Sequence, residues 1–394
     1  MDHRADRPPS PTTDQTEEAA KQRAALRRSM PVTRMLDYGM DYWDALQLTA
    51  TPVPQAWDEA ATLLADAQLE RARAAASRGD VETAVSCYRR ATAALVFAQL
   101  AHNADTTAKR SLYARLSRAY QDAADLDVDL HVERLSVPFR SSSCNAWLVR
   151  PSAERPGPTV VVVGGQSGWG PAYHRQAEAL ARRGLSTVLL EAPGQGETRM
   201  LNGLYLDDGS HEAFGATLDL LQERDGSEGP FGVWGNSFGG LLAARAAVHD
   251  DRFRACCVNG APARPVPAPF RTAVEQARAL LGVETDDDVA AVFRTLWIDP
   301  DLDRMPGSLL VLHGAQDPLV TLEQQEVFLE LSPRASLRTW EDGEHTIYNH
   351  SSERTELVAD WFRSQLDPPG GLDRRRPRGR DRRDDGHAPT PTGG

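Results

Sequence analysis

The sequence predicts an α/β protein: a mostly parallel, doubly wound sheet that follows an N-terminal helical domain. From about residue 126 onward, short apolar runs alternate with helical segments, a pattern typical of parallel strands joined by crossover helices. One run, Val160–Val163, is continuous and β-branched, as a strand covered on both faces requires. Residues 17–125 instead place apolar side chains three and four positions apart, which is the period of helices.

Composition divides the chain into four segments. Residues 1–16 are rich in Pro, Thr, Asp and Arg, and residues 367–394 mix charge runs with Pro and Gly, so both are predicted to be disordered. Residues 17–125 are expected to form a helical cap domain. Residues 126–366 are expected to form the sheet domain, with a helical lid insertion at about 266–298. One apolar stripe of the cap is predicted at Val85, Tyr88, Ala91, Leu95 and Ala98.

The sheet domain is expected to contain eight strands bounded by turn residues. In order they are HVERLSVPF and CNAWLVRP, which form a pair, then TVVVVGG, STVLLEAPG, FGVWGNS, FRACCVNGAP, SLLVLHGAQD and ASLRTWEDG. Helices are expected at Tyr173–Arg183, His211–Arg224, Gly239–Val248 and Leu322–Leu331.

Charge and cysteine content exclude several classes of function. A net charge of −12 argues against nucleic-acid binding, which needs a basic face. No apolar stretch approaches about 18 residues, as a membrane span requires, and the N-terminus has no apolar signal core. The four cysteines form no CxxC pair or metal-ligand spacing, and Cys256 and Cys257 are expected to be buried in a strand. We therefore expect a cytoplasmic protein without metal or cofactor, whose partner is a small molecule; a homodimer remains open. Only Lys21 and Lys109 are lysines, so arginine supplies almost all the positive charge.

The stretch GVWGNSFGG places Ser237 between Gly235 and Gly239, after an apolar strand and before a helix. This is the setting of a nucleophile elbow, in which the serine adopts a strained conformation and a Cβ on a flanking residue would clash. The alternative is a plain glycine turn that enters a helix.

A serine nucleophile needs a base and an orienting carboxylate. His345 and Asp317 follow later strands, and the order Ser, Asp, His matches one known arrangement of such triads on a doubly wound sheet. The rival bases are His313 and His350, and the rival acids are Glu341 and Asp342.

An oxyanion hole requires fixed N–H donors beside the attacked carbonyl. The backbone N–H of Phe238, directly after the serine, is expected to be one donor. The second is expected from Gln166, in the glycine loop that follows TVVVVGG. The GQG stretch at 194–196 is expected to be a simple turn.

Together, TVVVVGG, LLEAPGQGET, GNSFGG, HGAQDPLV and GEHTIYNH resemble the FrsA-like α/β-hydrolases, a family that includes dihydroxypseudooxynicotine hydrolase and polyketide chain-shortening hydrolases. The resemblance covers most of residues 30–365. It implies an α/β-hydrolase fold, a triad of Ser237, Asp317 and His345, and a substrate held between the helical domain and the hydrolase core. Several members cleave a carbon–carbon bond beside a ketone, and others are esterases. Ser167 stands where some carbon–carbon cleaving members carry an acidic residue, so their substrate preference does not carry over directly.

We therefore expect a serine-type hydrolase that cleaves an acyl bond, either C–C beside a ketone or ester, of a small aromatic or polyketide-like metabolite of secondary metabolism. An acyl transferase or cyclase would use the same triad, with a nucleophile of the substrate in place of water. A third hypothesis is a catalytically silent hydrolase fold that binds a ligand. Five residues near the predicted entrance of the substrate pocket are expected either to pack in the core or to bind substrate: Ser167, Trp169, Tyr173, His174 and Tyr348.

Overall fold

An eight-stranded sheet lies at the centre of the larger part of the molecule, in the strand order β1-β2-β4-β3-β5-β6-β7-β8. The computed structural model describes residues 17, 21, 24–26, 29–50, 55–152, 157–227 and 229–367. Strands β1 and β2 pair antiparallel, as does β2 with β4, and every other pair is parallel. The strands are β1 (Leu130–Phe139), β2 (Ser142–Pro151), β3 (Thr159–Val163), β4 (Ser186–Leu190), β5 (Phe231–Asn236), β6 (Phe253–Asn259), β7 (Ser308–Gly314) and β8 (Ala335–Trp340). The predicted α/β class and mostly parallel sheet are confirmed.

Alternate residues of the central strands pack into two different cores. Val160 and Val162 of β3 face a core that also contains residues of α7, α14 and the N-terminal helices. Val161 and Val163 face the opposite core, which is shared with α9 and α10. Strand β3 is therefore buried on both faces, as its continuous valine run predicts. The helices and 3-10 turns of the sheet domain are η1 (Gly170–Tyr173), α7 (His174–Ala181), α8 (Gly196–Met200), η2 (Asp208–His211), α9 (Glu212–Asp225), α10 (Phe238–His249), α11 (Arg271–Leu281), α12 (Asp286–Thr295), α13 (Leu322–Leu329), η3 (His345–His350) and α14 (Ser351–Leu366).

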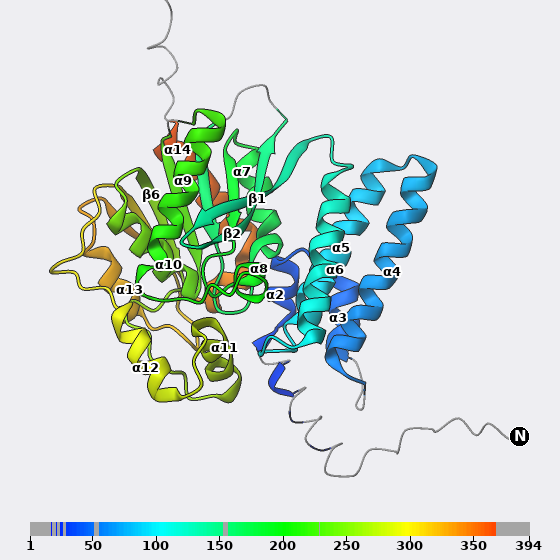
Figure 1. Cartoon of the computed structure of the whole chain (residues 1–394), viewed down its shortest axis with the longest axis horizontal. Coiled ribbons are helices and arrows are strands. Elements are labelled where there is room, and N and C mark those ends of the chain that lie inside the picture. The colour runs from blue at the N-terminus through cyan, green and yellow to red at the C-terminus, as the bar shows by residue number, and fades with distance from the viewer. Residues whose placement is uncertain are drawn as a thin grey trace, which may run out of the picture.

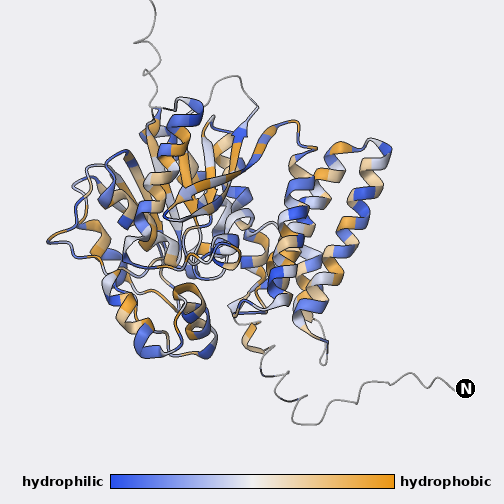
Figure 2. Cartoon of the chain, in the orientation of Figure 1, coloured by the Kyte–Doolittle hydropathy of each residue, from blue (hydrophilic) through white to orange (hydrophobic). Residues whose placement is uncertain are grey.

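The N-terminal helices stand beside the sheet, with α2 between the longer helices and the sheet (Figure 1). They are α2 (Val32–Asp37), α3 (Tyr42–Ala50), α4 (Trp57–Arg78), α5 (Val81–Gln99) and α6 (Thr107–Ala124). Gly79, with a φ of 80°, ends α4 and turns the chain into α5. Every residue from Ala91 to Gln99 is buried, so the predicted single stripe understates the burial of α5. The reason is its central position: α5 packs on both α4 and α6, and the outer face of α4 carries the polar residues (Figure 2).

The insertion between β6 and β7 contributes helices α11 and α12, which lie together below the sheet in Figure 1. Phe293 of α12 is buried, and its ring centre lies 5.3 Å from that of Phe238 at the start of α10. The Leu206 N–H donates to the carbonyl of Leu280 in α11 at 3.1 Å. The insertion thus packs on the turn after Ser237.

The predicted domain boundaries stay predictions, although α2 to α6 fall within residues 17–125 and β1 to α14 within residues 126–366. The segments predicted to be disordered, 1–16 and 367–394, lie outside the described residues except for Asp367. Among the described helices, none combines the length and apolar character that crossing a membrane requires.

A buried ion pair joins α2 to α14. Arg354 Nη2 donates to Asp37 Oδ1 at 2.6 Å, and Arg354 Nη1 donates to Oδ2 at 3.2 Å. The two side chains are 1% and 3% exposed. Because a charge without its partner is costly in such a site, this contact holds the two ends of the described chain together.

We expect Asp37→Ala to lower the free energy of unfolding by about 3–5 kcal/mol, because it leaves the Arg354 guanidinium buried and uncompensated. The matched control is Asp360→Ala, which removes an exposed partner of Arg183 and should cost at most about 1 kcal/mol. Urea denaturation of both variants measures the difference. Equal losses would contradict a special role for the buried pair.

Candidate active site

Ser237 lies in the turn between β5 and α10, with a φ of 54° and a ψ of −135°. Residues other than glycine rarely adopt a positive φ, and such strain is concentrated at functional sites. A Cβ on Gly235 would lie 2.0 Å from the Gly239 oxygen, and a Cβ on Gly239 would lie 2.3 Å from the Gly164 oxygen. Both flanking positions therefore require glycine, as predicted, and the turn has the geometry of a nucleophile elbow.

Two hydrogen bonds connect Ser237 to His345 and Asp317. Ser237 Oγ lies 2.9 Å from His345 Nε2, and His345 Nδ1 lies 2.8 Å from Asp317 Oδ2. The Asp317 side chain is fully buried, and its Oδ1 accepts the backbone N–H groups of Leu319 at 2.8 Å and Val320 at 3.2 Å. With both carboxylate oxygens fixed, the aspartate favours a proton on Nδ1 of the imidazole and leaves Nε2 free to accept the serine proton.

The rival bases and acids lie in other environments. His313 is buried within β7. His350 Nε2 contacts Asp342 Oδ1 at 2.9 Å, and the side chain of Glu341 is exposed. Among the described residues, none of these four has a hydrogen bond to Ser237.

Neighbouring loops hold the turn that follows the candidate base. Thr346 and Ile347 adopt left-handed conformations, with φ values of 50° and 61°. Asn259, at the end of β6, donates to the Thr346 carbonyl at 3.1 Å and to Asn236 Oδ1 at 2.8 Å. Arg354 Nη1 also donates to the Thr346 carbonyl, at 2.9 Å. The turn that carries the base is thus tied to the turn that carries the serine.

The loop after β3 packs directly on Ser237. A Cβ on Gly165 would lie 3.0 Å from Ser237 Cβ and 3.2 Å from its Oγ. The backbone N–H groups of Phe238 and Gln166, the two predicted oxyanion donors, have no hydrogen-bond partner within the described part of the chain. Both donors therefore flank the serine without a competing acceptor.

Gln195 is a site residue that the sequence did not reveal. Its buried side chain donates from Nε2 to the carbonyls of Gly164 at 2.6 Å and Gly165 at 3.1 Å. Trp169 Nε1 donates to the same Gly165 carbonyl at 2.9 Å. A turn is present at 194–196, as predicted; it leads into α8, and its glutamine also fixes the loop beside the serine. The only signal was a glutamine between two glycines after a strand.

Helix α2 also contributes contacts that no motif indicates. Arg34 Nη2 donates to Ser167 Oγ at 3.1 Å, and the Arg34 guanidinium carbon lies 5.8 Å from the ring centre of Tyr348. Thr33 Oγ1 donates to Glu344 Oε2 at 2.7 Å. A short helix with one arginine has no distinctive spacing, so only the fold shows that α2 touches both loops of the site.

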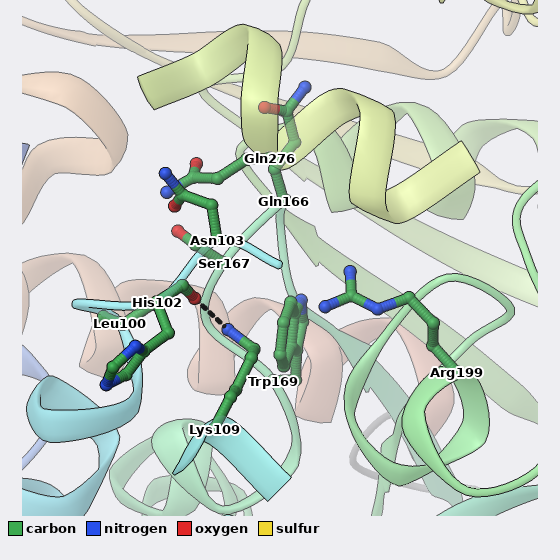
Figure 3. A pocket seen from close by; sticks show the side chains of 9 residues that line it. All are labelled: Leu100, His102, Asn103, Lys109, Gln166, Ser167, Trp169, Arg199 and Gln276. Carbon is green, nitrogen blue, oxygen red and sulfur yellow. Dashed lines mark hydrogen bonds between the residues drawn. The ribbon is translucent and has the colours of Figure 1, made fainter. Parts of the chain in front are cut away.

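A small cavity lies beside this loop, between the N-terminal helices, α8 and α11 (Figure 3). Its volume is about 10 Å³, close to what one water molecule needs. Asn103, on its wall, donates to Glu275 Oε2 of α11 at 2.8 Å. Pockets for metabolites usually have several hundred Å³, so the cavity as it stands is too small for one. The cavity is lined by Leu100, His102, Asn103, Lys109, Gln166, Ser167, Trp169, Arg199 and Gln276.

Within the described ranges, no group of three or more His, Cys, Asp or Glu side chains could hold a metal ion.

Known proteins share this architecture. Residues 158–296 match the family described as alpha/beta hydrolase fold. The 2,6-dihydropseudooxynicotine hydrolase of Paenarthrobacter nicotinovorans is 26% identical over 256 residues, which are 63% of this chain and 68% of that protein. This chain has the α/β-hydrolase fold. The motif-based resemblance to hydrolases of this kind is confirmed.

Two solved structures extend the likeness to the N-terminal helices. The crystal structure of a 2,6-dihydroxy-pseudo-oxynicotine hydrolase superposes with a TM-score of 0.76 at 22% identity, covering 85% of this chain and 95% of that chain. Wild-type AbyA5 superposes with a TM-score of 0.67 at 21% identity, covering 88% of this chain and 95% of that chain. The hydrolase therefore shares the fold of these proteins over more than its sheet domain.

Two of the five residues predicted to pack or to bind substrate line the cavity of the hydrolase: Ser167 and Trp169. The other three are buried outside its lining: Tyr173, His174 and Tyr348. Tyr173 and Tyr348 pack on Tyr38, which directly follows α2, and His174 Nδ1 lies 2.8 Å from the Tyr120 hydroxyl of α6. Packing between the N-terminal helices and the core explains these three, and their contact with substrate stays a prediction.

A buried carboxyl joins α6 to the hydrolase core. Tyr113 of α6 donates its hydroxyl to Glu191 Oε1 at 2.5 Å, and the Glu197 backbone N–H donates to Glu191 Oε2 at 2.6 Å. Burial raises the pKa of Glu191 to about 7, and the neighbouring Glu197 carboxylate adds to the increase. This junction is therefore most stable when Glu191 is protonated.

We expect the stability of the hydrolase to fall as the pH rises through about 7, because folding favours protonated Glu191. The contribution is complete below the ordinary glutamate pKa and is lost above the raised value. Glu191→Gln removes this titration. The wild-type free energy of unfolding should decline relative to the variant by roughly 3 kcal/mol between pH 4.5 and 8. Urea denaturation at both pH values measures this, and parallel pH curves would contradict it.

Proposed function

We propose that the hydrolase cleaves an acyl bond of a small metabolite, with Ser237 as nucleophile, His345 as general base and acid, and Asp317 as the orienting carboxylate. The observation that carries this proposal is the continuous hydrogen-bonded chain from Asp317 through His345 to Ser237, at 2.8 and 2.9 Å. A nucleophile, a base within hydrogen-bond reach and a third group that orients the base are the parts that serine catalysis needs.

In the proposed reaction, Ser237 Oγ attacks the substrate carbonyl carbon while His345 Nε2 accepts the hydroxyl proton. The resulting oxyanion accepts hydrogen bonds from the backbone N–H groups of Phe238 and Gln166. Collapse breaks the acyl bond, and the leaving group takes the proton from His345. Water then attacks the acyl-enzyme while His345 Nε2 accepts a proton from this water. The Ser237 Oγ–acyl bond breaks, His345 returns the proton to Ser237 Oγ, and the acid product leaves.

The proposed substrate is a small aromatic or polyketide-like molecule, cleaved at an ester or at a C–C bond beside a ketone. The name of the relative from Paenarthrobacter nicotinovorans gives 2,6-dihydropseudooxynicotine as its substrate, which supports a small metabolite here. The position of the cavity beside Gln166, with walls from the N-terminal helices and α11, supports binding of such a substrate between the two parts of the molecule.

Ser237→Ala should abolish covalent labelling by a small fluorophosphonate, because the attacking oxygen is removed. Asp317→Asn should slow labelling by about 10⁴-fold, because the imidazole loses its correct tautomer. Intact-mass spectrometry over time measures both rates. His350→Gln, which changes the half-buried rival base, is the control and should label at the wild-type rate.

No labelling of the wild type, or equal labelling of Ser237→Ala, would refute the proposed nucleophile. Turnover in oxygen-18 water then tests the second half of the reaction. One labelled oxygen in the acid product supports hydrolysis, whereas an unlabelled cyclic or transferred product would show that a nucleophile of the substrate replaces water.

A further inference from the structure

Lys109, near the start of α6, places a buried ammonium in the cavity wall. The residue is 2% exposed, and its Nζ donates to the carbonyls of His102 at 2.6 Å and Gln99 at 3.4 Å. Among the described residues, no carboxylate lies within ion-pair distance of this ammonium. Its charge is therefore buried without a counter-ion.

The neighbouring cation differs in this respect. Arg199 donates to both carboxylate oxygens of Asp105, at 3.1 and 2.8 Å, so its charge is compensated. Trp169 lies between the two cations (Figure 3), with Lys109 Nζ 5.3 Å and the Arg199 guanidinium carbon 5.1 Å from its ring. The tryptophan ring stabilises both cations through its face, and its indole N–H holds the loop that carries Gln166.

The composition of the wall reinforces this charge imbalance. Lys109 and Arg199 line the cavity, and no aspartate or glutamate does, although the whole chain carries a net charge of −12. Asp105 pairs directly with Arg199, whereas Lys109 has no carboxylate in direct contact within the described part of the chain. Lys109 could simply cap the end of α5, which would explain its two hydrogen bonds to carbonyl groups. Capping alone, however, does not require a charged side chain in a cavity wall.

We propose that Lys109 binds an anionic oxygen of the substrate, a carboxylate, phenolate or enolate, beside the loop that contains Gln166. This assignment rests on the proposed function, since it names the class of substrate that reaches Ser237. Hydrogen bonds between charged groups are stronger than those between neutral groups. A bound anion would give the Lys109 ammonium the ion-pair partner that the described residues do not provide.

The electrostatics agree with the geometry. Burial lowers the pKa of Lys109 to about 7; Arg199 lowers it further, and Asp105 opposes this change. A bound anion favours the charged ammonium and offsets the burial penalty. Lysine, unlike arginine, can lose its proton at such a site.

The test compares anionic and neutral esters of matched length. Mono-(4-nitrophenyl) esters of succinate, glutarate and adipate are each paired with the neutral 4-nitrophenyl ester of an alkanoate of the same chain length. The wild type should prefer the best anionic ester in kcat/KM by about 10- to 100-fold, the range expected for a charged hydrogen bond. Lys109→Gln keeps an N–H donor for the carbonyls but removes the charge, and should abolish this preference.

Two further variants separate charge from folding. Lys21→Gln, at an exposed lysine paired with Glu17, should keep the wild-type preference, and Lys109→Arg should retain at least part of it. Fluorophosphonate labelling of Lys109→Gln should match the wild type, which shows an intact nucleophile. Equal losses for anionic and neutral esters, or an unchanged preference in Lys109→Gln, would overturn the proposal and leave only a capping role.

The ratio between the two esters should also depend on pH. The preference should be present at pH 6 and weaker at pH 8.5, because Lys109 loses its charge through about pH 7; Lys109→Arg should remove this dependence. Arg199, Asp105 and His102, which is paired with Asp58, are the other charged or titratable groups around the ammonium. The titration of His345 acts on both esters and cancels in the ratio.

A binding measurement tests the subsite independently of catalysis. On Ser237→Ala protein, calorimetry with glutarate and with 4-nitrophenolate at pH 7 distinguishes a carboxylate from a phenolate ligand. Addition of Lys109→Gln should weaken the binding of the preferred anion by about tenfold or more. If the wild type turns over none of the esters but Ser237→Ala still binds an anion in a way that depends on Lys109, only the proposed function is refuted. Absence of binding by either anion would refute the Lys109 site.

Discussion

The buried pair of Asp37 and Arg354 is the contact on which the geometry of the candidate active site depends. Arg354 is held by the carboxylate of Asp37 and donates from the same guanidinium to the Thr346 carbonyl. Thr346 directly follows His345, so the position of the candidate base depends on a residue more than three hundred positions earlier. A buried ion pair is poor evidence for stability but strongly restricts the arrangement of its neighbours once formed.

Helix α2 extends this constraint to the other side of the site. Arg34 contacts Ser167, in the loop with the candidate oxyanion donor, and Thr33 contacts Glu344, immediately before the candidate base. The N-terminal helices are therefore more than a cover for the pocket. The sheet provides the strand ends from which the reacting groups project, and α2 fixes two of the loops relative to each other.

Local patterns in the sequence predicted the strands, the elbow and the order of the candidate triad, because each rests on contacts close in the chain or on the rule that strand ends share one edge. The contacts of Arg34 and Gln195 could not be predicted in this way, since their partners lie 133 and about 30 residues away. Lys109 has the same difficulty: a lysine in the first turn of a polar helix normally faces solvent. Its burial follows only from the packing of α6 on α5 and the core.

The closed cavity connects these features. Under the proposed function, a metabolite that binds here needs more room than the cavity has, and separation of Asn103 from Glu275 would provide that room and hydrate Lys109. Closure then removes water from the ammonium, which costs free energy unless an anion takes the place of water. Under the proposed role of Lys109, an anionic substrate lowers the cost of closing while a neutral one does not. The charge of the substrate would then select the closed state in which Gln166 and Ser237 face the same carbonyl, so that recognition at Lys109 and acyl chemistry at Ser237 are coupled through a single movement.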